Sequence, residues 1–190
     1  MRQSARGFTL VEIMIVVAII ALLAAIAIPN VLRGRTTANE SAAVGNIRAL
    51  ISSLEMARSV NSAYPNTAAA ATNWGPFMYG TSCTGAAGDT VNPDFGPPSF
   101  CVAGALTAQL VQGFNYTYTN GPTAGQTYNI LAVPATPGNT GTRSFYTNES
   151  GQVRHCREVN PAAATAASAR TPTANWVTID QPLPAALNCN

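Results

Sequence analysis

The apolar residues of this chain change their spacing near residue 30. From Phe8 to Ile28 the sequence is apolar except for Thr9 and Glu12. A run of about 20 apolar residues crosses the hydrocarbon core of a bilayer as a helix. Arg2 and Arg6 precede the run, and positive residues stay on the cytoplasmic side of a membrane. The pattern therefore predicts an exported protein with one N-terminal membrane helix.

A second helical pattern follows, from Thr36 to about Arg58. Its apolar residues recur at three- and four-residue spacing, as in an amphipathic helix: Ile47, Leu50, Ile51 and Leu54. Pro29 lacks an N–H and is expected to kink or loosen the helix between the two patterns. Tyr64-Pro65 is expected to end it. We therefore predict one helix of about fifty residues, with its first half in the membrane and its second half packed on a domain.

Alternation with a period of two begins at Phe114. Phe114, Tyr116 and Tyr118 alternate with polar residues, as in a half-buried strand. Three more strand candidates follow after turn signals: Thr127–Val133, Arg143–Thr147 and Gln152–Cys156. We expect an antiparallel meander of three or four strands that packs on the outer half of the helix. The predicted fold class is α+β.

Two long stretches lack a clear period, residues 65–113 and 160–190. Both are rich in small residues and proline, and they predict irregular structure. Phe100–Val111 is a candidate for a short strand or a helical turn. Trp176, Val177 and Ile179 are candidates for docking a last segment on the core.

Charge narrows the possible partners. Charged residues make up 9% of the chain, the net charge is +2, and every basic residue is an arginine. The arginines are scattered, whereas nucleic-acid binding needs a clustered basic face. We therefore predict no nucleic-acid partner.

Four cysteines lie after the apolar run, and an even number in an exported domain favours disulfides. Three pairings of Cys83, Cys101, Cys156 and Cys189 are possible. The simplest joins nearest neighbours, Cys83 with Cys101 and Cys156 with Cys189. The second bond would tie the tail to the last strand.

The sequence shows no pattern typical of a catalytic or metal-binding site. His155 is the one histidine, and no motif fixes it beside Asp180 and a serine as a triad would require. The cysteines lack the C-x-x-C spacing of a zinc site, and the acidic residues are too dispersed for calcium. We predict no catalytic, cofactor-binding or metal-binding residues, and no enzyme activity.

The apolar run has three interpretations. It is a signal peptide cleaved after Ala27, a plain anchor, or an anchor in which Glu12 has a function. The run exceeds the 7–15 apolar residues usual in a signal peptide. A plain anchor leaves the cost of a carboxylate in lipid unexplained.

The third interpretation rests on a motif. The segment from Gly7 through Phe8 to Glu12 follows a short basic leader and opens the apolar run, and Pro29 ends the run. This order and spacing resemble the start of type IV prepilins, a family that includes the pseudopilins of type II secretion. The resemblance covers about the first thirty residues.

The resemblance implies a pathway for the protein. A prepilin peptidase would cut between Gly7 and Phe8 and methylate the new amine of Phe8. Glu12 would then pair with that amine on a neighbouring subunit during filament assembly. The implied division is a leader at 1–7, a transmembrane assembly helix at 8–28 and a pilin-like extracytoplasmic domain at 29–190.

The expected function is that of a structural subunit of a type IV pilus or related filament. The alternatives are a pseudopilin of type II secretion, or a secreted binding module cleaved after Ala27. The implied partners are copies of itself, other pilins, prepilin peptidase, an inner-membrane assembly platform and, before assembly, membrane lipid. The implied location is the inner membrane first, then a surface pilus or a periplasmic pseudopilus.

Overall fold

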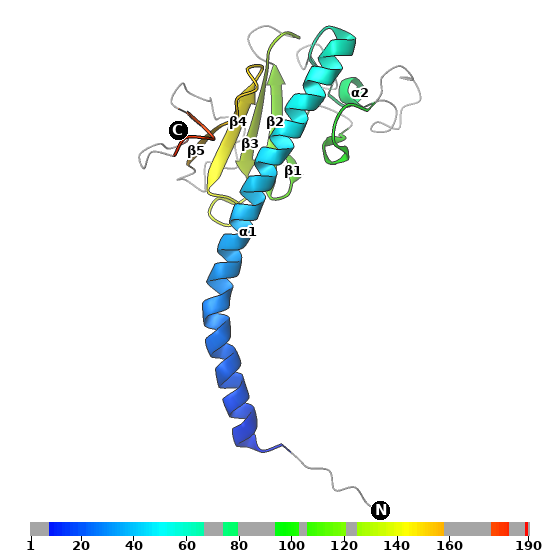
Figure 1. The fold of residues 1–190 in the computed structure, drawn as a ribbon. Helices are drawn as coiled ribbons and strands as arrows, with labels where there is room; N and C mark the ends of the chain where they lie inside the picture. The colour runs from blue at the N-terminus through cyan, green and yellow to red at the C-terminus, as the bar shows by residue number, and fades with distance from the viewer. Residues whose placement is uncertain are drawn as a thin grey trace, which may run out of the picture. The chain divides into compact units, whose positions relative to one another are not determined.

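The chain folds into one long helix, a six-stranded sheet and short elements between them (Figure 1). The structure, a computed structural model, describes residues 8–66, 74–79, 94–102, 106–120, 125–157, 176–182 and 189. Its elements are α1 (Leu10–Asn61), α2 (Trp74–Met78), a 3-10 turn (Pro98–Phe100), β1 (Gln109–Val111), β2 (Phe114–Asn120), β3 (Tyr128–Pro134), β4 (Arg143–Asn148), β5 (Arg154–Arg157) and β6 (Val177–Thr178). The α+β class predicted from the sequence is confirmed.

Two compact units divide the chain, Met1–Arg35 and Thr36–Asn190. The first unit contains the apolar part of α1. Pro29 does not end the helix, although its missing N–H leaves one carbonyl without its usual donor. The side-chain amide of Asn30 donates to the carbonyl of Ile26 at 3.1 Å, which adds a hydrogen bond beside the proline.

In the second unit, α1 presents one face to the core. The buried apolar residues on this face recur every three or four positions, as the sequence pattern predicts: Ala43, Ile47, Leu50, Leu54 and Ala57. The helix ends at Asn61, and Ser62 follows with a φ of 58°, a left-handed conformation that breaks the helical path. The predicted end before Tyr64-Pro65 is confirmed.

The sheet is an antiparallel meander in which the strands follow one another in chain order, β1-β2-β3-β4-β5-β6. The prediction of three or four strands was too low. The four predicted strands correspond to β2 to β5. The other two are edge strands of three and two residues. β1 lies within Phe100–Val111, the candidate for a short strand, and β6 lies within the candidate docking segment, but both are too short for a period of two to define them.

The two faces of the sheet have separate cores. On the face toward α1, the alternating aromatic side chains of β2 pack with Tyr128, Ile130, Ala132 and Phe145 of β3 and β4. On the opposite face, Leu131 and Val133 of β3 pack with Trp176 near the C-terminus. Strand β3 is therefore buried on both sides, and the C-terminal segment covers part of the second face.

The prediction that residues 65–113 are irregular was wrong for Trp74–Met78, which form helix α2. Trp74 anchors it: the side chain is fully buried, its indole N–H donates to the carbonyl of Phe100 at 3.1 Å, and its ring lies 4.9 Å from that of Tyr118. These contacts come from distant parts of the chain. Local sequence patterns therefore did not predict this helix.

Candidate functional site

The first unit exposes an apolar helical surface. Large apolar side chains from Phe8 to Leu32 stand at about half to four-fifths exposure, and Phe8 is 78% exposed. Among the described residues, α1 is the one helix long and apolar enough to cross a membrane, and its most apolar window buries nothing inside the protein. A surface this apolar requires lipid or other protein around it.

A cap fixes the start of this helix. The backbone N–H of Glu12 donates to the side-chain oxygen of Thr9 at 3.2 Å. Thr9 is thus the N-cap of α1, and Glu12 occupies the third helical position. Thr9 and Glu12 have the T-x-x-E spacing of a capping box, a local pattern that is visible in the sequence. It adds Thr9 to the residues that define the site.

The carboxylate of Glu12 has no hydrogen bond or ion pair with another described residue. The positive end of the helix dipole favours a negative charge at this position. That interaction is modest, about 0.3–1 kcal/mol, whereas an ionised side chain costs about 2.5–3.5 kcal/mol at the centre of a bilayer and less near its edge. A cationic partner would therefore stabilise Glu12 further.

Gly7 and Phe8 are the two residues between which the prepilin peptidase is predicted to cut. Phe8 lies one residue before the cap, exposed and adjacent to the helix start. Gly7 lies outside the described residues. Cleavage between them stays a prediction, as does the division into leader, membrane helix and globular domain.

A second polar cluster lies inside the globular unit. Glu40 of α1 is 6% exposed and accepts hydrogen bonds from the backbone and side chain of Thr142 at 2.7 and 2.8 Å. It also forms an ion pair with Arg143 of β4, with N–O distances of 2.7 and 2.8 Å. Glu40 is therefore buried, although acidic residues on an amphipathic helix usually face water. Thr142 and Arg143 follow Glu40 by about a hundred positions in the chain. Their hydrogen bonds offset the desolvation cost of burying the Glu40 carboxylate, and they connect α1 to β4.

His155 of β5 extends this cluster. Its Nδ1 lies 3.3 Å from a guanidinium nitrogen of Arg143, and its Nε2 lies 3.4 Å from the carbonyl oxygen of Gln181. Because a guanidinium can only donate, Nδ1 accepts and Nε2 carries the hydrogen. Burial, and then the charge of Arg143, lower the pKa of His155 below its usual value. His155 is therefore neutral near pH 7 and belongs to the packing of the sheet.

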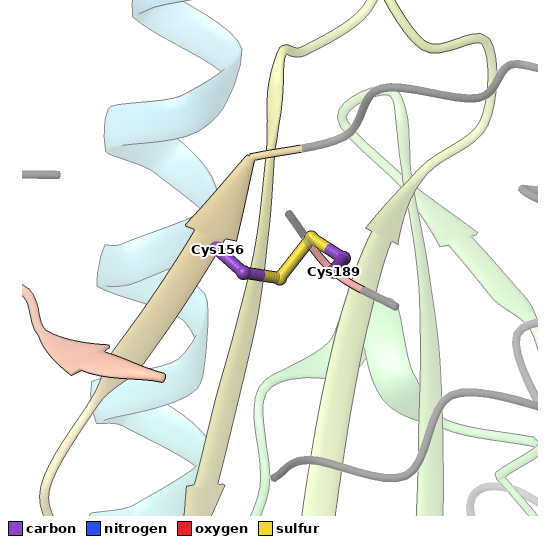
Figure 2. Close-up of a disulfide and its surroundings, with 2 residues drawn as sticks. All are labelled: Cys156 and Cys189. Atoms are coloured by element: carbon purple, nitrogen blue, oxygen red, sulfur yellow. A yellow bond between two sulfur atoms is a disulfide. The ribbon is translucent and has the colours of Figure 1, made fainter. Parts of the chain in front are cut away.

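The Cys156–Cys189 disulfide is present, as nearest-neighbour pairing predicts (Figure 2). It joins β5 to the last described residue, and the backbone N–H of Cys189 also donates to the carbonyl of Arg157 at 3.0 Å. Cys101 is disulfide-bonded as well. Cys83 lies outside the described residues.

No group of three or more metal-ligating side chains forms within the described part of the chain. Asp180 follows β6, two positions after its last residue. The described residues thus include an exposed apolar helix with an acidic residue near its start, and a separate unit with its own core.

Comparison with known proteins finds similarity over about a third of the chain. The prokaryotic N-terminal methylation motif matches residues 2–28. The resemblance to type IV pilins and type II pseudopilins, inferred from the order of Gly7, Phe8 and Glu12, is confirmed for this segment. No solved structure matches the chain.

Three relatives illustrate the similarity. The type II secretion system core protein G of Klebsiella michiganensis is 46% identical over 66 residues, which cover 35% of this chain and 46% of the relative. The protein of the same name from Escherichia coli K12 is 44% identical over 62 residues, covering 33% and 43%. The type IV wide pilus major component PilA4 of Thermus thermophilus is 41% identical over 68 residues, covering 36% and 52%. The chain thus spans about half the length of the curated relatives it matches.

Proposed function

We propose that this chain is a structural subunit of a type IV pilus or related filament and polymerises through the apolar part of α1. One observation carries the proposal. An exposed apolar helix begins with a carboxylate that no described residue neutralises. Lipid satisfies the apolar side chains but not the carboxylate. Bundling of such helices in a filament satisfies both.

The cation we assign to Glu12 is the N-terminal amine of Phe8 on a neighbouring copy. Thr9 holds the start of the helix, so Phe8 and Glu12 lie within about one turn of each other on every subunit. In a low dielectric an oppositely charged partner recovers much of the cost of burying each ion. The pair would therefore favour a defined axial offset between neighbouring helices over lateral association at random.

This pairing requires that the leader be removed. Cleavage by a prepilin peptidase between Gly7 and Phe8 creates the amine, and it removes Arg2 and Arg6, which resist transfer across the bilayer. In this scheme one helix anchors the subunit in the inner membrane before assembly. An inner-membrane assembly platform then adds it to a surface pilus or a periplasmic pseudopilus. We assign the chain no enzymatic role.

A pseudopilin of type II secretion is the second candidate. It is favoured by the relatives that bear the name type II secretion system core protein G, among them those of Klebsiella michiganensis and Escherichia coli K12. Their matches cover about a third of this chain, and the methylation motif matches residues 2–28. That motif spans much of the apolar part of α1, which both kinds of filament use in this proposal.

Intact-mass measurement of the processed protein tests the pathway. We expect a chain that begins at Phe8 with a methylated amine. Replacing Gly7 with leucine should leave an uncut precursor in the membrane and no filaments. A mature chain that begins at Ile28 would instead identify a signal peptide and a secreted binding module, and would overturn the proposal.

Glu12→Leu tests the pairing. The substitution makes the anchor more apolar, so membrane insertion should persist, while filament yield should fall at least about tenfold because the amine loses its counter-charge. Glu12→Asp is the matched control: it keeps the charge and should retain part of the yield. Filament yield equal to wild type in Glu12→Leu would show that this carboxylate has no role in assembly.

A further inference from the structure

At the far end of the apolar segment, α1 carries a groove that ends at an arginine. Ala27, Ile28, Val31, Leu32 and Arg35 line a groove of about 200 Å³, and all five lie in the first unit. Most of them recur at three- and four-residue spacing, so they share one face of the helix. The small side chain of Ala27 leaves room between the larger apolar residues.

The charge of Arg35 has no acidic neighbour along the helix. Residues 13–39 contain no aspartate or glutamate. The nearest acid beyond them, Glu40, already pairs with Arg143. An anion that binds at Arg35 must therefore come from outside this unit.

The position of Arg35 indicates which anion this is. If Phe8 lies at the inner edge of the hydrocarbon core, about 20 helical residues reach the outer edge near Ile28. Arg35 follows seven positions later, about 10 Å further along the helix, a few ångström beyond the headgroup layer, which is about 5–7 Å thick on each side. Its long side chain can extend to a phosphate while its carbons stay against the apolar groove.

Resting on the proposed membrane-bound state of the subunit, we propose that this groove binds an anionic phospholipid of the outer leaflet, with the phosphate on Arg35 and the glycerol and upper part of an acyl chain along Leu32 to Ala27. A free phosphate would use only the arginine. The apolar groove adjoining the charge favours a ligand with both parts.

Arg33 provides a matched control. It lies two positions from Arg35, so it points to a different side of the helix at nearly the same depth, and it does not line the groove. Arg33→Gln and Arg35→Gln remove the same charge. A nonspecific attraction to an anionic membrane would weaken equally in both variants.

The test uses the full chain reconstituted in vesicles of phosphatidylglycerol and phosphatidylcholine, extracted in mild detergent and measured by native mass spectrometry. We expect the wild type to retain phosphatidylglycerol over phosphatidylcholine. Arg35→Gln should lower this retention about fivefold, whereas Arg33→Gln should leave it within about twofold. Ala27→Leu should also lower it, because the added side chain fills the groove while both arginines remain.

Equal loss in the two arginine variants, or no loss in Arg35→Gln, would overturn the proposal. So would cross-linking of Arg35 to a second copy that is lost in Arg35→Gln, since the partner would then be protein. Protease protection confirms that each variant inserts in the same orientation. Filament yield, measured separately, distinguishes failure of the lipid site from failure of the assembly role, because the vesicle measurement requires no filament.

Discussion

Two tyrosines at the centre of the sheet differ in how their hydroxyl groups are satisfied. Tyr118 and Tyr128 are both buried, and their rings stack with centroids 6.1 Å apart. The hydroxyl of Tyr118 donates to the carbonyl of Pro65 at 2.8 Å. The hydroxyl of Tyr128 is the buried side-chain polar atom without a partner among the described residues. One hydroxyl therefore stabilises the fold, and the other imposes a desolvation cost.

Phenylalanine substitutions should separate these effects. Tyr118→Phe should lower the free energy of unfolding by about 1–2 kcal/mol, because the Pro65 carbonyl loses its donor. Tyr128→Phe should leave it unchanged or raise it by up to about 1 kcal/mol. Urea unfolding of the two variants measures the difference. A larger loss in Tyr128→Phe than in Tyr118→Phe would mean that the Tyr128 hydroxyl has a partner.

His155 should make the globular unit sensitive to acid. Its pKa is lowered in the folded protein by burial and by Arg143, so the unfolded chain takes up the proton first as the pH falls. The stabilisation is complete above about pH 6.5 and is lost as the pH falls below that value toward the folded pKa. Nearby charges are Arg143 and Glu40, with opposite effects on the ring.

The pH dependence of unfolding tests this expectation. Between pH 7 and pH 5 the wild type should lose stability, and His155→Gln should lose less, because glutamine keeps hydrogen-bonding capacity but does not titrate. The comparison of slopes matters more than the absolute stability of the variant. Equal slopes would show that other groups cause the acid sensitivity.

At the scale of elements, sequence periodicity predicted the helices and strands that bury one regular face. Strands β2 to β5 and the outer half of α1 lie within a few residues of their predicted bounds. Helix α2, β1 and β6 have two to five residues each, too few to show a period; β1 and β6 fall in segments that the sequence indicated only as candidates, and α2 was not predicted.

The candidate site was predictable only where it consists of local features of the sequence. Phe8, Glu12 and the apolar run are local features of the sequence. The burial of Glu40 was not, because Thr142 and Arg143 come to it through the packing of α1 on β4. Thr9 could have been found from its spacing to Glu12.

The Cys156–Cys189 bond acts on one element, the C-terminal segment. The described residues of this segment have few apolar anchors: Trp176 packs against Tyr146, with ring centroids 6.1 Å apart, Ile179 packs on the core, and two residues of β6 pair with β5. The cysteines are 33 positions apart, and closing a loop of this length stabilises a fold by about 4 kcal/mol in the chain-entropy model.

Replacing Cys156 and Cys189 together with alanine should therefore release the tail first. We expect proteolysis near the C-terminus and a red shift of Trp176 fluorescence, with the helical circular dichroism signal retained. Trp176→Phe in the same background assigns the fluorescence change to that residue. Loss of the helical signal together with the tail would show that the segment is required for the whole sheet to fold.

At the scale of the whole molecule, the two units have different requirements. Among the residues that the structure describes, every buried apolar core residue lies after Arg35, with Ala43 the first along the chain. The first unit buries almost nothing within the protein and exposes its apolar side chains. Folding and assembly are therefore separable: the second unit contains the residues that form the core, and the first contains those proposed to join subunits.

A chain that begins at Thr36 should consequently fold without the membrane segment. We expect it to be soluble and monomeric, to contain both helix and strand by circular dichroism, and to unfold in one transition seen equally by fluorescence and circular dichroism, as a domain with its own core does. The full chain, in contrast, should partition into vesicles and associate. Size-exclusion chromatography and denaturant unfolding make the comparison. Self-association of the shortened chain as strong as that of the full chain would place the polymerising surface in the globular unit and refute its assignment to the start of α1.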